Sequence, residues 1–358
     1  MKAAMTVLAL MALTAAASGE FATGGSDLFS FSGYNNFRFA VWGRDGHDPG
    51  NGFDFYNRTT WSPGVSETLS AVISFDTRFG FTSWDSVTST YLSDDYTLKL
   101  VEAYGTISFT PEISLSGGRF KLPFGFGYNR PGSSMPYYDR VIAVSAPIFA
   151  MFGGKDLGVM VSTDFGPVAV DLAYTNGTDS HADTTVSKQF TARLSARPSE
   201  WIALGGAVAI IGQPEMETID SWSASGLDFY AYGDYPIASG LTVNYEGEYL
   251  VLPWPGPALD NMVNEGGGDY NFSLACTRDV ELGILTAVQP AVRYEILSPP
   301  EQVVSGDPVP ETDMSALDFC LNLHTGEMNT VQIGGRNYSY ENGDDGHTDI
   351  YVNWRMLF

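Results

Sequence analysis

Charged side chains in this chain recur at every second position of segments whose other positions are apolar. Around residue 75, Ile73 and Phe75 alternate with Ser74, Asp76 and Arg78. A β-strand has a side-chain period of two, so such a segment carries its charges on one face. Fixed charges on one face of a strand attract or repel ions and polar solutes, and this is the chemistry that the pattern predicts.

Covalent chemistry has less support in the sequence. The four histidines, His47, His181, His324 and His347, fall in separate predicted loops or strand ends, and none belongs to a recognisable nucleophile motif. A hydrolase stays a minor alternative. A fold that places a histidine next to a serine and a carboxylate would support it. We therefore expect no enzyme and no catalytic residue.

The chain begins with a segment typical of export. Lys2 precedes an apolar run over 3–17 whose last alanines fit the small-x-small rule of signal peptidase, which predicts a signal peptide over 1–19. Residues 20–358 contain no stretch near the ~20 apolar residues that a spanning helix needs. If this part crosses a membrane, it must do so as a closed barrel, because only that arrangement pairs all backbone groups of its strands in lipid.

The chain ends with a strand pattern. Residues 350–358 place Trp354, Met356 and Phe358 on one apolar face, and the sequence stops on that phenylalanine. This pattern resembles the closing strand and assembly signal of bacterial outer-membrane barrels. The resemblance implies recognition by the barrel assembly machinery, a location in the outer membrane of a Gram-negative bacterium, and contact with its lipid and lipopolysaccharide.

Turn signals divide the chain into strands joined alternately by short and long connections. Short turns are predicted at 63–66, 110–112, 164–167, 197–200, 235–240, 278–281 and 325–327. Long connections are predicted over 44–52, 81–96, 122–154, 176–187, 212–221, 253–268, 298–313 and 339–347. This rhythm predicts an all-β fold, a transmembrane antiparallel β-barrel of about 16 strands, with 14 or 18 possible.

Charges on the middle of such strands must face the lumen, because an Arg or Lys that faces lipid costs about 2–4 kcal/mol. A barrel of about 16 strands has a lumen wide enough for water and small solutes. The charges predicted to line it are Arg38, Asp76, Arg78, Arg193, Glu246, Glu248, Arg293, Glu295, Asp318, Arg336 and Arg355.

One internal segment resembles a known family. Residues 118–127, Gly-Arg-Phe-Lys-Leu-Pro-Phe-Gly-Phe-Gly, are similar to a strand end in the phosphate-selective porin O and P family, and residues 101–104 resemble the strand before it. The resemblance implies an outer-membrane porin, a homotrimer and a third long loop, 122–154, that folds into the barrel. The pore-constriction residues that it implies are Arg119, Lys121, Arg130, Asp139, Arg140, Lys155 and Asp156.

Other interpretations of this segment stay open. Its apolar stretch, Val141 to Met151, could pack at a subunit interface or form an extra strand. Pro123 and the neighbouring glycines could simply end a strand and shape a loop.

The net charge of −24 suggests a cation channel, but many acidic residues fall in predicted outer loops, where salt screens them. Only 18 basic residues are present, too few to favour a phosphate-selective path. We therefore expect a porin for passive diffusion of small hydrophilic solutes and ions, general or weakly cation-preferring. The alternatives are an anion- or phosphate-selective porin and a plugged barrel with a structural or adhesive role.

No pattern predicts a cofactor or a nucleic-acid partner. The acidic segments 45–48 and 341–347 could hold Ca²⁺ or Mg²⁺ at the surface, although solvated acidic turns are the simpler interpretation. Cys276 and Cys320 are too few for a disulfide framework, so free thiols are expected.

Overall fold

The computed structural model describes residues 29–44, 50–64, 66, 68–86, 89–131, 134–137, 152–177, 188–213, 222–252, 267–298, 302–304, 307–309, 313–326, 328–341 and 346–357. Several predictions fall on other residues and are not addressed by it. These are the signal peptide, Asp139, Arg140, Phe358 and the greater part of the two acidic segments.

Sixteen antiparallel strands form a closed barrel. They are β1 (Phe29–Arg44), β2 (Gly50–Pro63), β3 (Leu69–Ser86), β4 (Ser89–Thr110), β5 (Ile113–Lys121), β6 (Lys155–Asp164), β7 (Val168–Thr175), β8 (Lys188–Ser199), β9 (Ile202–Gln213), β10 (Trp222–Ala238), β11 (Leu241–Leu252), β12 (Gly267–Leu282), β13 (Leu285–Ser298), β16 (Met314–His324), β17 (Asn329–Tyr340) and β18 (His347–Leu357). The ring closes between β1 and β18, where Asn36 lies opposite Arg355. The predicted 16-stranded barrel is confirmed.

Alternation along the strands separates an apolar outer face from a polar inner face. On β12, the side chains of Tyr270 and Phe272 are 52% and 57% exposed on the outside, whereas those of Asn271 and Ser273 are buried on the inside. The period of two follows from strand geometry, and closure of the ring gives each of its strands a neighbour on both sides. An apolar outer face suits lipid, and a polar inner face suits water.

The short turns lie close to the predicted places, but one predicted long connection is wrong. Residues 81–96 belong mostly to β3 and β4, which stay paired as far as Ser86 and Ser89. The serines and aspartates of this stretch favour a loop. Its threonines and aromatic residues favour strands, and pairing satisfies the backbone groups of both strands.

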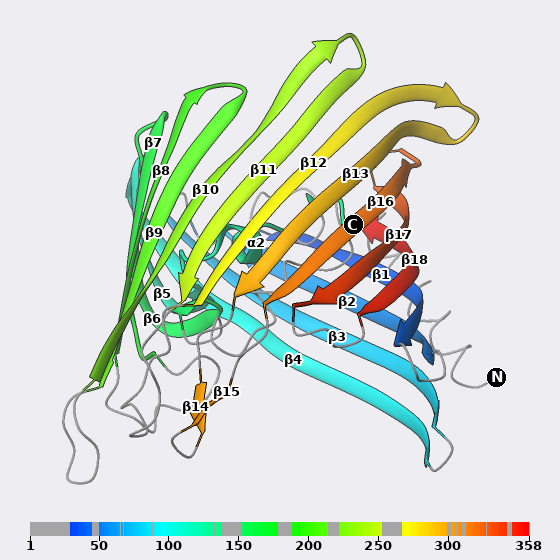
Figure 1. Ribbon diagram of the computed structural model, residues 1–358. Helices are drawn as coiled ribbons and strands as arrows, with labels where there is room; N and C mark the ends of the chain where they lie inside the picture. The colour runs from blue at the N-terminus through cyan, green and yellow to red at the C-terminus, as the bar shows by residue number, and fades with distance from the viewer. Residues whose placement is uncertain are drawn as a thin grey trace.

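Two short elements lie in the long connections. The connection after β5 contains α2 (Phe126–Asn129), and Figure 1 shows this helix inside the ring of strands. The connection after β13 contains β14 (Gln302–Val304) and β15 (Asp307–Val309), which pair with each other at one end of the barrel. Within the described ranges, no helix is long and apolar enough to cross a membrane.

Candidate functional site

The connection after β5 starts with a compact turn built around Asn129. The side-chain amide nitrogen of Asn129 donates to the carbonyl oxygens of Leu122, Phe124 and Gly125 at 2.9, 2.8 and 3.0 Å. Gly125 has a φ of 78°, a left-handed conformation that glycine adopts without strain. The turn therefore folds as a unit, and the backbone N–H groups of Gly125 and Gly127 point toward the wall.

Two carboxylates of the wall hold this turn. The N–H of Gly125 donates to Asp228 Oδ2 on β10 at 3.1 Å, and the N–H of Gly127 donates to both carboxylate oxygens of Glu248 on β11 at 3.1 and 3.2 Å. Both carboxylates are buried. Three hydrogen bonds to buried carboxyl oxygens, where water does not compete, fix the turn against β10 and β11.

The next part of the loop reaches a different wall. The carbonyl oxygen of Met135 accepts a hydrogen bond from Arg355 on β18 at 2.8 Å. The carbonyl oxygen of Pro136 accepts from Asn322 on β16 at 2.9 Å and from Gln332 on β17 at 3.1 Å. The loop that leaves β5 therefore crosses the lumen. Over its described residues as far as Tyr137, it folds inward as predicted, while 138–151 lie outside the described residues. We call the segment 122–137 the inward loop.

Tyr137 forms the last described contact of the inward loop. Its hydroxyl lies 3.0 Å from Ser273 Oγ on β12, and its ring lies 4.6 Å from the guanidinium carbon of Arg293. Burial raises the pKa of Tyr137, so the phenol keeps its proton near neutral pH. The protonated hydroxyl can donate to Ser273 and anchor the segment.

Amide side chains on β11, β13, β16, β17 and β18 form a hydrogen-bonded belt along the lumen wall. This amide belt runs from Asn244 on β11 through Gln289, Asn322 and Gln332 to Asn353 on β18, at distances of 3.2, 3.0, 2.8 and 2.7 Å. An amide both donates and accepts, so each member can link two neighbours. The belt gives the wall a polar, uncharged surface and supplies two of the donors that hold the inward loop.

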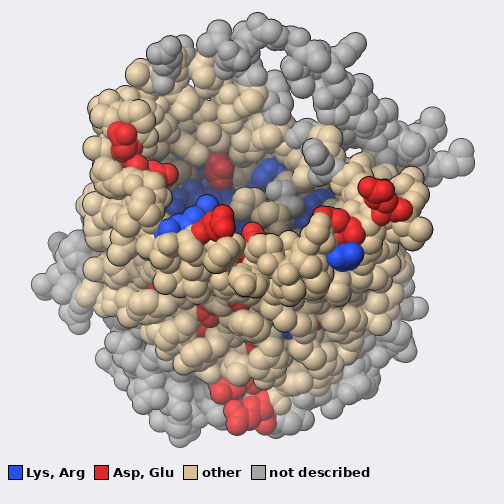
Figure 2. Space-filling view, turned by 90° about the horizontal axis from the view of Figure 1, so that it is seen from above, with Lys and Arg blue, Asp and Glu red and all other residues tan. Residues whose placement is uncertain are grey.

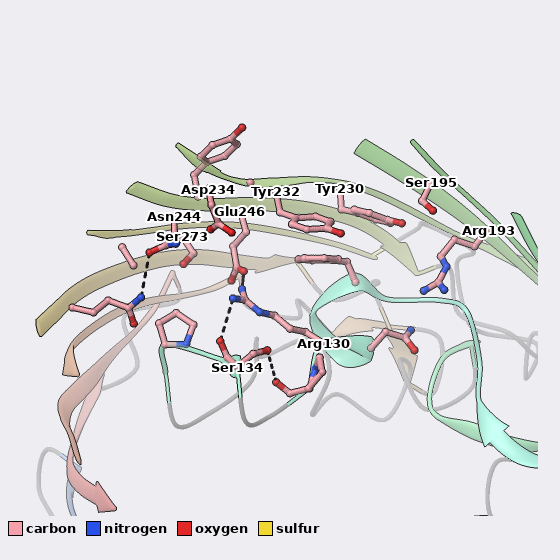
Figure 3. A pocket seen from close by; sticks show the side chains of 18 residues that line it. Arg130, Ser134, Arg193, Ser195, Tyr230, Tyr232, Asp234, Asn244, Glu246 and Ser273 are labelled. Carbon is pink, nitrogen blue, oxygen red and sulfur yellow. Dashed lines mark hydrogen bonds and ion pairs between the residues drawn. The ribbon is translucent and has the colours of Figure 1, made fainter. Parts of the chain in front are cut away.

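A cavity of about 530 Å³ lies between the inward loop and the wall (Figure 3). The ring of Phe126 stacks on those of Tyr230 and Tyr232, with centroids 4.8 and 4.7 Å apart. Arg130 of the loop forms an ion pair with Glu246 of β11 beside these rings. Other polar side chains around the cavity are Ser134, Arg193, Ser195, Asp234, Asn244 and Ser273.

The predicted lumen-facing charges lie on inward positions of their strands, many of them in ion pairs. Asp318 bonds both Arg293 and Arg336, at 2.7 and 2.5 Å, and Arg193 bonds Asp171 at 2.7 Å. The inward set comprises Arg38, Asp76, Arg78, Arg193, Glu246, Glu248, Arg293, Glu295, Asp318, Arg336 and Arg355. Figure 2 shows basic side chains gathered inside the hollow, with acidic ones among them and at the rim.

Acidic side chains form a buried strip across four adjacent strands. Asp228 on β10, Glu248 on β11, Asp269 on β12 and Glu295 on β13 are each 5% exposed or less. Asn271 donates to Glu248 and to Asp269, at 3.2 Å each. This acidic strip places four buried carboxyl groups on the wall that holds the inward loop.

The predicted constriction residues take different places. Arg130 reaches the cavity, whereas the ammonium groups of Lys121 and Lys155 lie over the ring of Tyr128 at 5.5 and 5.8 Å. Asp156 accepts a hydrogen bond from the N–H of Gly177 at 2.5 Å. The structure thus brings the two lysines together at the root of the inward loop, away from Arg130.

Arg119 lies on the opposite face from the one predicted. It pairs with Leu157 of β6, which is 53% exposed on the outer face, while the adjacent Phe120 is buried on the inner face. The prediction that Arg119 lines the constriction is wrong in this respect. A shift of one residue in a strand exchanges the two faces, and the motif alone does not fix which face each member takes.

Sequence reasoning overlooked the amide belt, because it considered charged side chains alone. The alternation along β16 could have identified it. Leu317, Phe319 and Leu321 face outward, so the residues between them and beside them face inward. These include both Asp318 and Asn322. Arg58, which bonds Asp76 at 2.6 Å, follows the same rule and was also missed.

Comparison with known proteins identifies the fold. No known protein-family model matches the sequence, and no curated protein matches it. The structure matches that of Pseudomonas putida OprB with a TM-score of 0.63 at 8% identity, over 92% of this chain and 94% of that one. The fold is that of the outer-membrane porins.

Two further structures support this porin fold. The anion-selective porin of Comamonas acidovorans has a TM-score of 0.57 at 10% identity, over 92% of this chain and 99% of that one. The trimer form of OmpT, an outer-membrane protein of Vibrio cholerae, has a TM-score of 0.52 at 10% identity, over 93% of this chain and all of that one. At identities this low, the structural similarity establishes a shared architecture only. The solute that passes through this barrel has to be inferred from the side chains of its own lumen.

Proposed function

We propose that this chain is a porin of the Gram-negative outer membrane, a water-filled channel for passive diffusion of small hydrophilic solutes and ions. The observation that supports it most directly is the inward loop, which is hydrogen-bonded across the lumen and leaves a cavity of about 530 Å³ beside it. A loop held in this way narrows a wide pore to the scale of small solutes. Membrane lipid, lipopolysaccharide and the barrel assembly machinery are the partners that this location implies.

Single-channel recording in planar bilayers with a KCl gradient tests this proposal. We expect a stable conductance from the folded, heat-modifiable barrel. A folded barrel that conducts no current would refute the porin proposal and favour the plugged barrel with a structural or adhesive role.

The lumen favours a general or weakly cation-preferring pore. The exposed carboxylate of Asp234 lines the cavity, and the arginines Arg193, Arg293 and Arg336 are already bonded to carboxylates. We therefore expect the reversal potential to move toward that of K⁺. Reversal toward Cl⁻ would instead support the anion- or phosphate-selective alternative.

The hydrolase alternative gains no support from the two histidines that the structure describes. His324 lies 3.0 Å from the hydroxyl of Thr330, and His347 stacks on Tyr338 with ring centroids 4.1 Å apart. Neither contact resembles the pairing of a base with a serine nucleophile.

We also propose that the barrel forms a homotrimer. Asn35 and Asn57 lie on the outward face of β1 and β2, where Asn57 Nδ2 donates to Asn35 Oδ1 at 2.8 Å and Thr59 donates to Asn57 at 3.0 Å. Polar side chains on the outer face favour a protein neighbour over lipid, which offers them no hydrogen bonds. Light scattering of the detergent-solubilised protein should give three chains per particle, and a single chain per particle would refute the proposal.

A further inference from the structure

The cavity beside the inward loop combines a flat apolar surface with a polar rim. Phe126 stacks on Tyr230 and Tyr232 with interplanar angles of 18° and 23°, so the three rings form one nearly parallel group. The hydroxyls of Ser134, Ser195 and Ser273 and the charged groups of Arg130 and Glu246 surround the rings (Figure 3). The volume of about 530 Å³ falls within the ~300–1,000 Å³ of small-molecule sites.

Both arginines around the cavity are bonded to carboxylates. Arg130 pairs with Glu246, and Arg193 pairs with Asp171. The remaining charged group, Asp234, accepts a hydrogen bond from the neutral amide of Asn244 at 2.6 Å. A charged solute would have to displace one member of such a pair and leave the other without its partner, which is costly. Carboxylate and guanidinium groups and serine hydroxyls are the kinds of group that form hydrogen bonds with hydroxyl groups.

We propose that this cavity is a binding site for an uncharged, polyhydroxylated solute of the size of a monosaccharide or disaccharide. A pyranose ring has a face of C–H groups that suits the electron-rich face of an aromatic ring, and a rim of hydroxyls that suits paired carboxylate and guanidinium groups. Phe126 provides the ring on the loop side, and Arg130 with Glu246 provides the polar rim. This inference rests on the proposed porin function and names the solute class of the same lumen.

The first experiment measures block of ion current by sugar. Maltose is added to bilayers that carry the open wild-type channel, and the current is recorded against maltose concentration. We expect a saturable decrease in current. A channel that conducts but shows no maltose-dependent decrease would overturn this inference and leave the porin proposal standing, whereas a folded barrel without conductance would refute both.

The second experiment tests the solute class without any variant. Swelling of liposomes that contain the protein is compared for glucose, gluconate and glucosamine, which share a carbon skeleton and differ in charge. We expect glucose to enter fastest, several-fold ahead of both charged relatives. Equal rates, or a faster rate for either charged solute, would contradict the inference.

The third experiment places the site. Replacement of the ring in Phe126→Ala should raise the half-blocking maltose concentration about tenfold, because a stacked ring is worth about that factor. The control is Tyr338→Ala, which removes an inward ring of β17 that stacks on His347 outside the cavity. Maltose block that is unchanged in Phe126→Ala, or weakened equally in both variants, would overturn the assignment to this cavity.

Discussion

The N–H of Gly127 donates a hydrogen bond at 3.1 Å to the carboxylate of Glu248, which lies 121 residues further along the chain. Glu248 belongs to the acidic strip of the barrel wall, and Gly127 belongs to α2 of the inward loop. The position of the loop in the lumen therefore depends on a carboxyl acceptor that the wall supplies.

Replacement of this acceptor should loosen the inward loop. Glu248→Gln replaces one of the two oxygens that accept from Gly127 by an amide nitrogen, which cannot accept. This weakens the contact by about 1 kcal/mol and should change the population of displaced loop about fivefold. Single-channel recording should show larger current fluctuations than in the wild type. Glu281→Gln, at an exposed position near the end of β12, is the matched control. Current traces that do not differ between the two variants would contradict the role of Glu248 in holding the loop.

The ion pairs around Asp318 should contribute strongly to barrel stability. Asp318 lies between Arg293 and Arg336, and all three side chains are 5% exposed or less. Asp318→Asn leaves two buried guanidinium groups without their carboxylate, at a cost of about 3–5 kcal/mol. Urea unfolding in lipid vesicles should show a much lower midpoint than for the control Asp279→Asn, whose side chain is exposed on β12. Equal midpoints would show that water in the lumen replaces the lost partner.

Gly118 should be required for assembly of β5 with β4. Its φ is 131°, and a Cβ added there would lie 2.4 Å from the carbonyl oxygen of Ala103. Gly118→Ala should cost about 2 kcal/mol or more and lower the folded fraction on heat-modifiability gels. The adjacent Gly117 has open space around its Cβ position, so Gly117→Ala is the control and should fold like the wild type. A folded fraction for Gly118→Ala equal to that of the control would contradict this prediction.

Asp234 should contribute to ion selectivity, because its exposed carboxylate lines the cavity. Asp234→Asn removes one negative charge from the pathway and should lower the K⁺ to Cl⁻ permeability ratio about two- to fourfold, as expected for an ion passing within about 5 Å in water. Reversal potentials in a KCl gradient measure this ratio. Glu281→Gln removes a charge from the exposed end of β12, where salt screens it, and should leave the ratio unchanged.

The sequence determined much of the wall. The alternation in β3, β11 and β13 identified the inward faces that carry Asp76, Glu248 and Arg293, because the period of a strand is fixed by its backbone. Turn signals placed the hairpins and therefore the strand number. The same reasoning failed at 81–96, where polar residues that resemble a loop continue two paired strands, and at Arg119, whose face depends on the register of β5 against β6.

The interior of the lumen was decided by tertiary structure alone. The inward loop meets Glu248 of β11 and Arg355 of β18 through its backbone N–H and carbonyl groups, and every residue has such groups, so no motif marks these contacts in the sequence. The stacking of Phe126 on Tyr230 and Tyr232 likewise joins residues about a hundred positions apart. Local periodicity determines whether a side chain faces the lumen or the outside. Only closure of the ring of strands determines which residues contact one another across the lumen.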